Sequence, residues 1–555
     1  MSKSKIKHIE SPRHAPMNVI YSKMHEPAKK DKTYEQKVLK AGSVCSEGGL
    51  PLPCAILCEK NVPVTLRDGA VIYTDVFRPD DAKQVPAIIA WSPYGKEFPG
   101  PPMQDTELSG LQKFESPDPA FWVQHGYAVL NPDTRGIGAS EDDFVQWGSQ
   151  QSEDGYDFVQ WTAGQSWCSG KVSFAGTSYL AISQWFIAAE QPPALACIAP
   201  WEGFSDIYAD SICAGGIPDY EFEKIMFART FHGLHYGEDM GAMAEQYPLY
   251  SAYWADKKAD LSRVTVPAYV VASYSNKVHS RGTLPAYLAA ASQDKWLRIH
   301  NTHEWYDFYH HQEDLLRFFD HYLKGLDNGW EETPRVRMAV LDPGGEDIID
   351  RPAEEYPVDS LQRKCLYLNA QTGCMEEELP SGVTAAEYRS DDNAGMAVFT
   401  YTFEEETEIA ENIRVRLWME CADTNDMDIF VMAKKLDDQG NELPVLVAGA
   451  PYCPPGEKAP FEWGNGRQRV SLRNGYTRPD YAPPGKPVEV TVTLAPMGMR
   501  FAAGQKLMIT VSGFYPAKPE IPDQPPLATV NQGTHRILCG GSFDSVLILP
   551  VNPSA

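Results

Sequence analysis

Short apolar segments alternate with helix-like segments through the first half of this 555-residue chain, and this alternation constrains the fold more than any other feature. Segments 85–92, 127–132 and 194–200 have the composition of strands that are buried on both faces. A helical pattern at 179–190 is one of those that separate them. Because strands that alternate with helices build a parallel sheet covered on both sides, residues 61–335 are predicted to form a doubly wound α/β domain.

Changes of pattern mark the limits of this domain and an insertion within it. Residues 1–60 are interpreted as a polar N-terminal arm with little periodicity, and a hairpin around Asp68-Gly69 opens the domain. Residues 206–258 are rich in Tyr, Met and Phe at helical spacing, which predicts a helical cap inserted between strands. From 336 to 555, short alternating segments separated by turn residues predict an all-β sandwich or jelly roll.

The charge and the cysteine content exclude several classes of protein. A net charge of −26 argues against nucleic-acid and anionic-membrane partners, because phosphate groups are bound by clustered Lys and Arg. The 11 cysteines show neither a metal-site spacing nor a disulfide framework, and we find no signal peptide and no apolar segment of membrane-spanning length. We therefore expect a cytoplasmic protein that acts on a small molecule without a metal or organic cofactor. The sequence leaves open whether it forms a homo-oligomer.

The motif Gly176-Thr-Ser178-Tyr179 joins a predicted strand to a predicted helix. A Gly-x-Ser at such a junction is typical of the nucleophile elbow of α/β-hydrolases, although Leu180 stands where the longer pattern has a second glycine. The helix that follows would direct free N–H groups and a positive dipole end toward an oxyanion. Ser178 is thus the predicted nucleophile, and the main-chain N–H of Tyr179 a predicted oxyanion donor.

A serine hydroxyl needs a neighbouring base in order to attack a carbonyl at neutral pH. In α/β-hydrolases the acid and then the histidine follow the serine along the chain, so the base is expected after the last major strand. Two histidines stand there, in Ile299-His300-Asn-Thr-His303. We predict His303 as the base and keep His300 as the alternative.

The acid of a triad is missing from its expected position. The segment after the strand at 269–273 contains Asn276 and no carboxylate. An asparagine can orient an imidazole, but it cannot stabilise the imidazolium by charge. The orienting residue is therefore predicted to be either Asn276 or Glu202, which ends the preceding strand, whereas Glu304 and Asp307 are expected to point elsewhere.

Tyr94 follows the first predicted parallel strand, where a second oxyanion donor commonly arises, and its hydroxyl is a candidate. Together with this segment and the Ser178 motif, several stretches resemble the cocaine esterase and X-Pro dipeptidyl-peptidase family of α/β-hydrolases. They are 133–140, 153–161, 165–172, 503–509 and 547–551.

The resemblance covers residues 60 to 552. It implies an α/β-hydrolase domain with a helical cap and a C-terminal jelly roll. It also implies that Ser178 is the nucleophile, His303 the base and Tyr94 the oxyanion tyrosine, and it puts Asn276 where the family has its acid.

The predicted function is hydrolysis of an ester or amide through an acyl-enzyme on Ser178. Two alternatives remain: an acyl transferase or cyclase of a biosynthetic pathway that uses the same serine, and a binding protein with impaired catalysis. An X-Pro type of peptidase would also need acidic groups for the free amine of its substrate, and Glu97, Asp105 and Glu202 are available. Aromatic residues of the predicted cap favour an apolar or aromatic acyl group. They are Tyr220, Phe222, Phe227, Phe231 and Tyr236.

Overall fold

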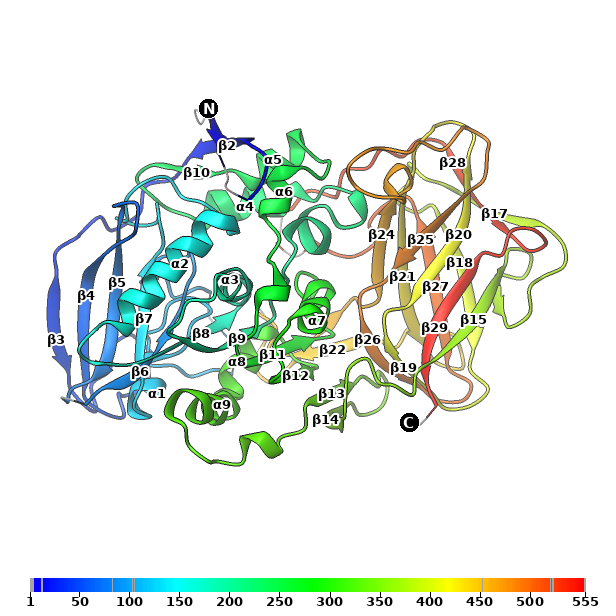
Figure 1. Cartoon of the computed structure of the whole chain (residues 1–555). Helices are drawn as coiled ribbons and strands as arrows, with labels where there is room; N and C mark the ends of the chain where they lie inside the picture. Colours follow the sequence, from blue (N-terminus) through cyan, green and yellow to red (C-terminus); the bar gives the residue numbers. More distant parts are fainter. Residues whose placement is uncertain are drawn as a thin grey trace.

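The computed structural model describes the chain except for residues 1–3, 11–12, 82, 102, 104, 452, 520, 522–523 and 554–555. Figure 1 shows two regions side by side: an α/β region that includes the N-terminus and a strand-rich region that includes the C-terminus. The predicted division into an α/β part followed by a β-rich part is confirmed.

An 11-stranded sheet forms the centre of the α/β region. In spatial order its strands are β14 (Ile348–Ala353), β13 (Val336–Val340), β12 (Lys295–His300), β11 (Ala268–Ser273), β9 (Leu195–Trp201), β8 (Cys168–Thr177), β6 (Val85–Ile89), β7 (Ala128–Asp133), β5 (Val71–Pro79), β4 (Ile56–Thr65) and β3 (Glu35–Leu39). The strands from β13 to β7 pair in parallel, and the outer ones are antiparallel. The predicted hairpin around Asp68-Gly69 is the β4–β5 turn.

Helices cover both faces of this sheet, which explains why its central strands are apolar throughout. In β11, Val270 and Ala272 belong to one core and Tyr269 and Val271 to the other. The helices are α1 (Pro119–Gln124), α2 (Gly148–Ala163), α3 (Tyr179–Ala188), α7 (Ser280–Ala289), α8 (Glu304–His310) and α9 (Gln312–Lys324), with the short turns η3 (Leu261–Arg263) and η4 (Trp330–Glu332). Within the described residues, no helix is both long and apolar enough to cross a bilayer.

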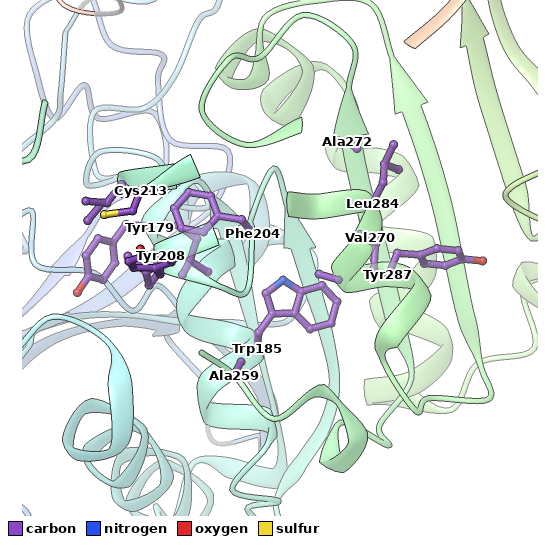
Figure 2. Close-up of a cluster of buried hydrophobic side chains, with 14 of the residues drawn as sticks. Tyr179, Trp185, Phe204, Tyr208, Cys213, Ala259, Val270, Ala272, Leu284 and Tyr287 are labelled. Carbon is purple, nitrogen blue, oxygen red and sulfur yellow. The ribbon is translucent and has the colours of Figure 1, made fainter. Parts of the chain in front are cut away.

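Helix α3, which begins directly after Ser178, is buried along its whole length. Trp185 of this helix lies in the cluster of apolar side chains that Figure 2 shows, and its Nε1 donates a hydrogen bond to the carbonyl oxygen of Gly203 at 3.0 Å. Because a fully buried helix is held by packing on all sides, its N-terminus is a rigid support for the residue before it.

Helical segments occupy residues 206–258 between β9 and β11, where the cap was predicted. They are η1 (Ile207–Ile212), η2 (Ala214–Gly216), α4 (Tyr220–Arg229), α5 (Met240–Gln246) and α6 (Ala252–Asp256). The short strand β10 (Tyr236–Glu238) was not predicted, because three residues carry no periodic signal.

The N-terminal arm has more regular structure than the sequence predicted. Strands β1 (Lys5–Ile9) and β2 (Met17–Lys23) form a small sheet with β10, and β3 pairs with β4 at the edge of the large sheet. We interpreted residues 1–60 as a polar arm with little periodicity, and the structure instead has strands in this segment. Strand β2 has a distant partner in β10, whereas β1 and β3 are largely exposed edge strands whose sequences carry no apolar periodicity.

The strand-rich region begins later than the expected boundary at residue 336, because β13 and β14 extend the sheet of the α/β region. Its strands are β15 (Gln362–Asn369), β16 (Cys374–Glu376), β17 (Thr384–Arg389), β18 (Met396–Thr402), β19 (Thr407–Glu411), β20 (Arg414–Cys421), β21 (Asp428–Leu436), β22 (Val445–Ala448), β23 (Lys458–Phe461), β24 (Asn465–Arg469), β25 (Val488–Thr493), β26 (Met497–Phe501), β27 (Lys506–Ser512), β28 (Thr534–Cys539) and β29 (Val546–Asn552), with one short turn, η5 (Val470–Leu472). Jelly-roll topology for this region stays a prediction.

Candidate active site

Ser178 stands at the junction of β8 and α3 with φ 57° and ψ −121°, a backbone conformation that is costly for a residue with a side chain. The preceding turn requires glycine at position 176. There φ is +132°, and an added Cβ would lie 2.4 Å from Leu180 Cδ2 and 2.7 Å from the carbonyl oxygen of Glu115. The strand, the helix and the loop that carries Glu115 therefore meet at this turn with no space for a side chain.

We expect Gly176→Ala to lower the free energy of unfolding by about 2–4 kcal/mol, through backbone strain and overlap with Leu180 and Glu115. Gly170 is a matched control, because its φ is also positive, at +88°, but an added Cβ would meet nothing within 4 Å. Gly170→Ala should cost about 1 kcal/mol. Urea denaturation of both variants measures the difference, and equal losses would show that the close approach at Gly176 contributes nothing.

The histidine that contacts Ser178 is His279, at the start of α7. Its Nε2 lies 3.1 Å from Ser178 Oγ, and its ring stacks on Phe204 with the ring centroids 5.4 Å apart. Burial lowers the pKa of His279 to about 3. The ring is therefore neutral at pH 7, which is the form that can accept a proton from a serine hydroxyl.

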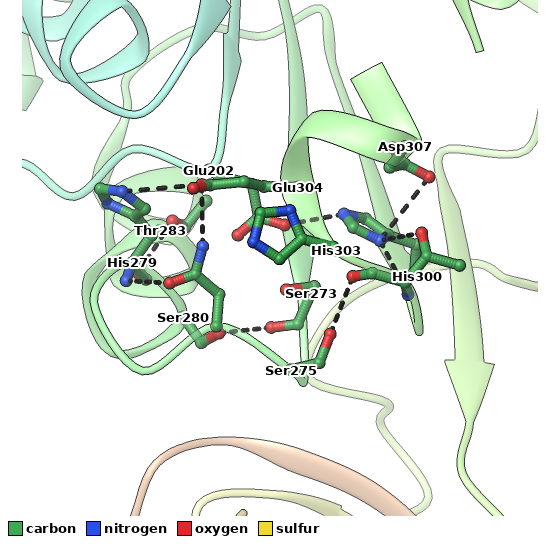
Figure 3. Close-up of polar contacts among 12 residues, drawn as sticks. Glu202, Ser273, Ser275, His279, Ser280, Thr283, His300, His303, Glu304 and Asp307 are labelled. Atoms are coloured by element: carbon green, nitrogen blue, oxygen red, sulfur yellow. Dashed lines mark hydrogen bonds and ion pairs between the residues drawn. The ribbon is translucent and has the colours of Figure 1, made fainter. Parts of the chain in front are cut away.

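A carboxylate and an amide lie next to this pair. Glu304 Oε2 is 3.7 Å from His279 Nε2, and Figure 3 shows these two side chains next to each other. Asn276 Nδ2 donates to Glu304 Oε2 at 2.8 Å. Asn276 Oδ1 accepts from the main-chain N–H groups of Val278 and His279 at 2.9 and 3.0 Å. Asn276 thus connects the carboxylate of Glu304 to the backbone that carries His279.

The loops after β11 and β12 carry these groups in the reverse of the predicted order. We expected the acid after β11 and the histidine after β12, whereas His279 follows β11 and Glu304 follows β12. The expectation that Glu304 points elsewhere was wrong. The sequence did contain a signal for this reversed order: a histidine stands three residues beyond Asn276, in a segment that has no carboxylate.

The two histidines predicted for the base lie elsewhere in the network. His303 Nδ1 accepts a hydrogen bond from the main-chain N–H of Trp305 at 3.3 Å and so caps α8, although the residue lines the same cavity as Ser178. His300 Nε2 lies 2.7 Å from Glu202 Oε1. Figure 3 shows the His300 group apart from His279 and Glu304. The predicted acid Glu202 therefore pairs with the alternative base, and the predicted contact of His303 with Ser178 is replaced by that of His279.

Tyr94 and Tyr179 lie where the sequence predicted them, at Ser178. Tyr94 interacts with the side chains of Ser178 and Glu115, and its ring packs edge-on against that of Tyr179 at 5.9 Å between centroids. Tyr179 is the first residue of α3, so its main-chain N–H is one of those that a helix leaves without an internal acceptor. Two hydrogen-bond donors can therefore serve an oxyanion at this position.

A cavity of about 320 Å³ opens at Ser178, and aromatic rings are the largest group of side chains in its lining. They belong to Tyr94, Phe98, Phe114, Trp147, Tyr179, Phe204, Phe222, Phe231 and Trp305. Phe222 and Phe231 come from the cap, as expected for two of its aromatic residues. Three carboxyl groups, those of Glu115, Glu223 and Glu304, also line it, whereas no lysine or arginine does so in the described part of the chain.

Comparisons with known proteins find matches in both the α/β region and the strand-rich region. The family model of the X-Pro dipeptidyl-peptidases (S15 family) matches residues 68–231, and that of the X-Pro dipeptidyl-peptidase C-terminal non-catalytic domain matches residues 328–548. A cocaine esterase from Rhodococcus sp. (strain MB1 Bresler) is 35% identical over 148 residues, which are 27% of this chain and 24% of the relative. The match thus spans about a quarter of that relative's length.

Two solved structures resemble nearly the whole chain. A CocE/NonD family hydrolase from Staphylococcus aureus is 32% identical with a TM-score of 0.82, over 90% of this chain and 94% of the other. An α-amino acid ester hydrolase is 17% identical with a TM-score of 0.69, over 89% and 96% of the two chains. At 17% identity, the similarity to the α-amino acid ester hydrolase shows only that the two proteins share a fold.

Proposed function

Since this chain belongs to the X-Pro dipeptidyl-peptidase (S15) and CocE/NonD family of hydrolases, we propose that it is a serine hydrolase that cleaves a small ester or amide through an acyl-enzyme on Ser178. The observation that carries this proposal is the 3.1 Å contact between His279 Nε2 and Ser178 Oγ at the strained turn before α3. A nucleophile and a base within hydrogen-bond distance are the minimal requirement of covalent acyl transfer.

In this mechanism His279 Nε2 takes the proton of Ser178 while Oγ forms a bond to the substrate's carbonyl carbon. The Tyr94 hydroxyl and the Tyr179 N–H stabilise the oxyanion. The alcohol or amine then leaves with the proton held by His279, and a water molecule repeats the sequence on the acyl-enzyme. Glu304 stabilises the transient imidazolium by charge, and Asn276 positions both groups.

The wall of aromatic rings supports an apolar or aromatic acyl group as the part of the substrate that enters the cavity. The name of the cocaine esterase relative supports an ester as the bond that is cleaved. The acidic residues considered for a peptidase have other contacts. Glu97 pairs with Lys29 and Lys60, Glu202 pairs with His300, and Asp105 accepts from the Gly456 N–H.

Three expectations from the sequence stay part of this proposal: a cytoplasmic location, catalysis without a metal or organic cofactor, and a small-molecule partner instead of nucleic acid or membrane. All 11 cysteines have free thiols, which is compatible with a reducing compartment. An acyl transferase or cyclase would use the same residues and differ only in its acceptor. Product analysis with amines or alcohols in competition with water distinguishes these reactions.

A fluorophosphonate probe tests the proposal without knowledge of the substrate. We expect the probe to form a covalent adduct that mass spectrometry locates on Ser178, because the probe reacts with serines that a base activates. Ser178→Ala should give no adduct, whereas Ser211→Ala, which removes another serine from the cavity wall, should react normally. Folded protein that remains unlabelled, or that is labelled equally in Ser178→Ala, would contradict the proposal.

A further inference from the structure

The carboxyl group of Glu115 lies beside Ser178, but it has no role in the mechanism proposed for that serine. Glu115 is 3% exposed, lines the Ser178 cavity, and its side chain interacts with those of Ser178 and Tyr94. We propose that Glu115 is a further catalytic residue, which as a neutral carboxylic acid donates a hydrogen bond to the oxyanion beside Tyr94. This inference rests on the proposed function of Ser178.

The two oxygens of Glu115 have different surroundings. Oε1 accepts a hydrogen bond from Trp305 Nε1 at 3.0 Å. Oε2 is buried and, within the part of the chain that the structure describes, no group meets it with hydrogen-bond geometry, although Ser178 and Tyr94 lie close to the carboxyl group. A buried carboxylate oxygen without a partner is costly, whereas a protonated Oε2 carries an O–H that can be offered to a substrate atom in the cavity.

The backbone holds Glu115 tightly against the turn that carries Ser178. Its φ is +64°, in the left-handed region that favours glycine. Its carbonyl oxygen accepts the N–H of Thr177 at 3.3 Å and lies against Gly176. Strained conformations of this kind persist where the surrounding structure fixes them, and they concentrate at functional sites. The position of the carboxyl group relative to Ser178 is thus determined by main-chain contacts.

Burial favours the neutral form of Glu115. The ionisable groups that line the cavity with it are Tyr94 from the loop after β6, Tyr179 from α3, Glu223 from α4, His279 from α7, and His303 and Glu304 from the start of α8. Burial raises the pKa of Glu115 to about 8, although the contacts with Trp305, Tyr94 and Ser178 act in the opposite direction. At pH 7 the acid form therefore predominates, and only this form can donate a hydrogen bond.

The chemistry needs no further reagent. When Ser178 Oγ bonds to the carbonyl carbon, the π electron pair moves to the carbonyl oxygen and the serine proton moves to His279. Glu115 keeps its own proton and shares it in a hydrogen bond with the new oxyanion, as Tyr94 does. When the carbonyl re-forms, the electron pair returns and the leaving group takes the proton from His279.

The rate of Ser178 modification by a fluorophosphonate between pH 5 and 10 tests this role, since the phosphoryl oxygen also gains charge as the serine attacks. In the wild type we expect the rate to fall as the pH rises through the pKa of Glu115. Glu115→Gln keeps an N–H donor and cannot ionise, so it should react within about tenfold of the wild type at pH 7 and lose this alkaline fall. Glu115→Ala should be about 10²–10³-fold slower.

Trp305→Phe provides a second readout that a structural role would not move. The Trp305 N–H favours the ionised carboxylate, so its loss should raise the pKa of Glu115 and shift the alkaline fall to higher pH. The inference is overturned if Glu115→Ala reacts as fast as the wild type, if Glu115→Gln is as slow as Glu115→Ala, or if the alkaline fall remains in Glu115→Gln. A wild type that is not labelled at all would instead refute the proposed function, on which this inference depends.

Discussion

Replacing His279 by alanine is expected to lower kcat/KM for a p-nitrophenyl ester by about 10⁴-fold or more, because Ser178 then has no base at hydrogen-bond distance. His303→Ala is the matched comparison, since His303 lines the same cavity and caps a helix. It should lower kcat/KM by less than about tenfold. Steady-state kinetics of both variants at pH 7 measures the contrast.

The control for folding is the thermal unfolding midpoint. It should change little in His279→Ala, because the aromatic side chains around the imidazole stay packed when it is removed. Added imidazole should restore part of the labelling of Ser178 in His279→Ala, since the free base can enter the space that the ring leaves. A large loss of activity in His303→Ala together with a small loss in His279→Ala would restore the original prediction and contradict the assignment of His279.

Replacing Asp307 by alanine is expected to lower the free energy of unfolding by about 3–5 kcal/mol, because it leaves the guanidinium of Arg298 buried without its carboxylate. Arg298 Nη1 donates to Asp307 Oδ1 at 2.9 Å, and the side chains are 2% and 1% exposed. Glu442→Ala removes one partner of the exposed Lys434–Glu442 pair and should cost less than about 1 kcal/mol. Urea denaturation at pH 7 compares the two variants.

The same ion pair predicts a dependence of stability on pH. Burial by itself would raise the pKa of Asp307. The charge of Arg298, together with His300 and His311, outweighs burial and holds this pKa well below its usual range. A carboxylate whose folded pKa is lowered stabilises the fold above its unfolded pKa, near 4, and that stabilisation is lost as the pH falls further. The difference in unfolding free energy between wild type and Asp307→Asn should therefore shrink on acidification below pH 4. A constant difference would contradict the role of the ionised Asp307.

Much of the fold followed from local patterns. The apolar strands and the helices between them were predicted because their periodicity is a property of a few consecutive residues. Strands β1 and β3 were missed because they are largely exposed edge strands without an apolar pattern, and β2 and β10 because each pairs with a segment far away in the sequence. Strands β13 and β14 were placed in the wrong region because the pairing of β13 with β12 decides which sheet they join. Sheet membership is a long-range property, and a single sequence carries little signal for it.

The positions of Ser178 and Tyr179 were determined by the sequence alone, since a strand, a tight turn and a helix in succession put the serine at the helix N-terminus. Tyr94 was located by the apolar strand that precedes it. Only the tertiary structure decided which histidine and which carboxylate reach that serine. His279 and His303 follow the neighbouring strands β11 and β12, and His300 is the last residue of β12, so the turns of the two loops decide which of them reaches Ser178. The paths of these loops depend on packing against the cap and on the hydrogen bonds of Asn276. Such contacts join segments that are separate in the sequence, so no local sequence pattern reveals them.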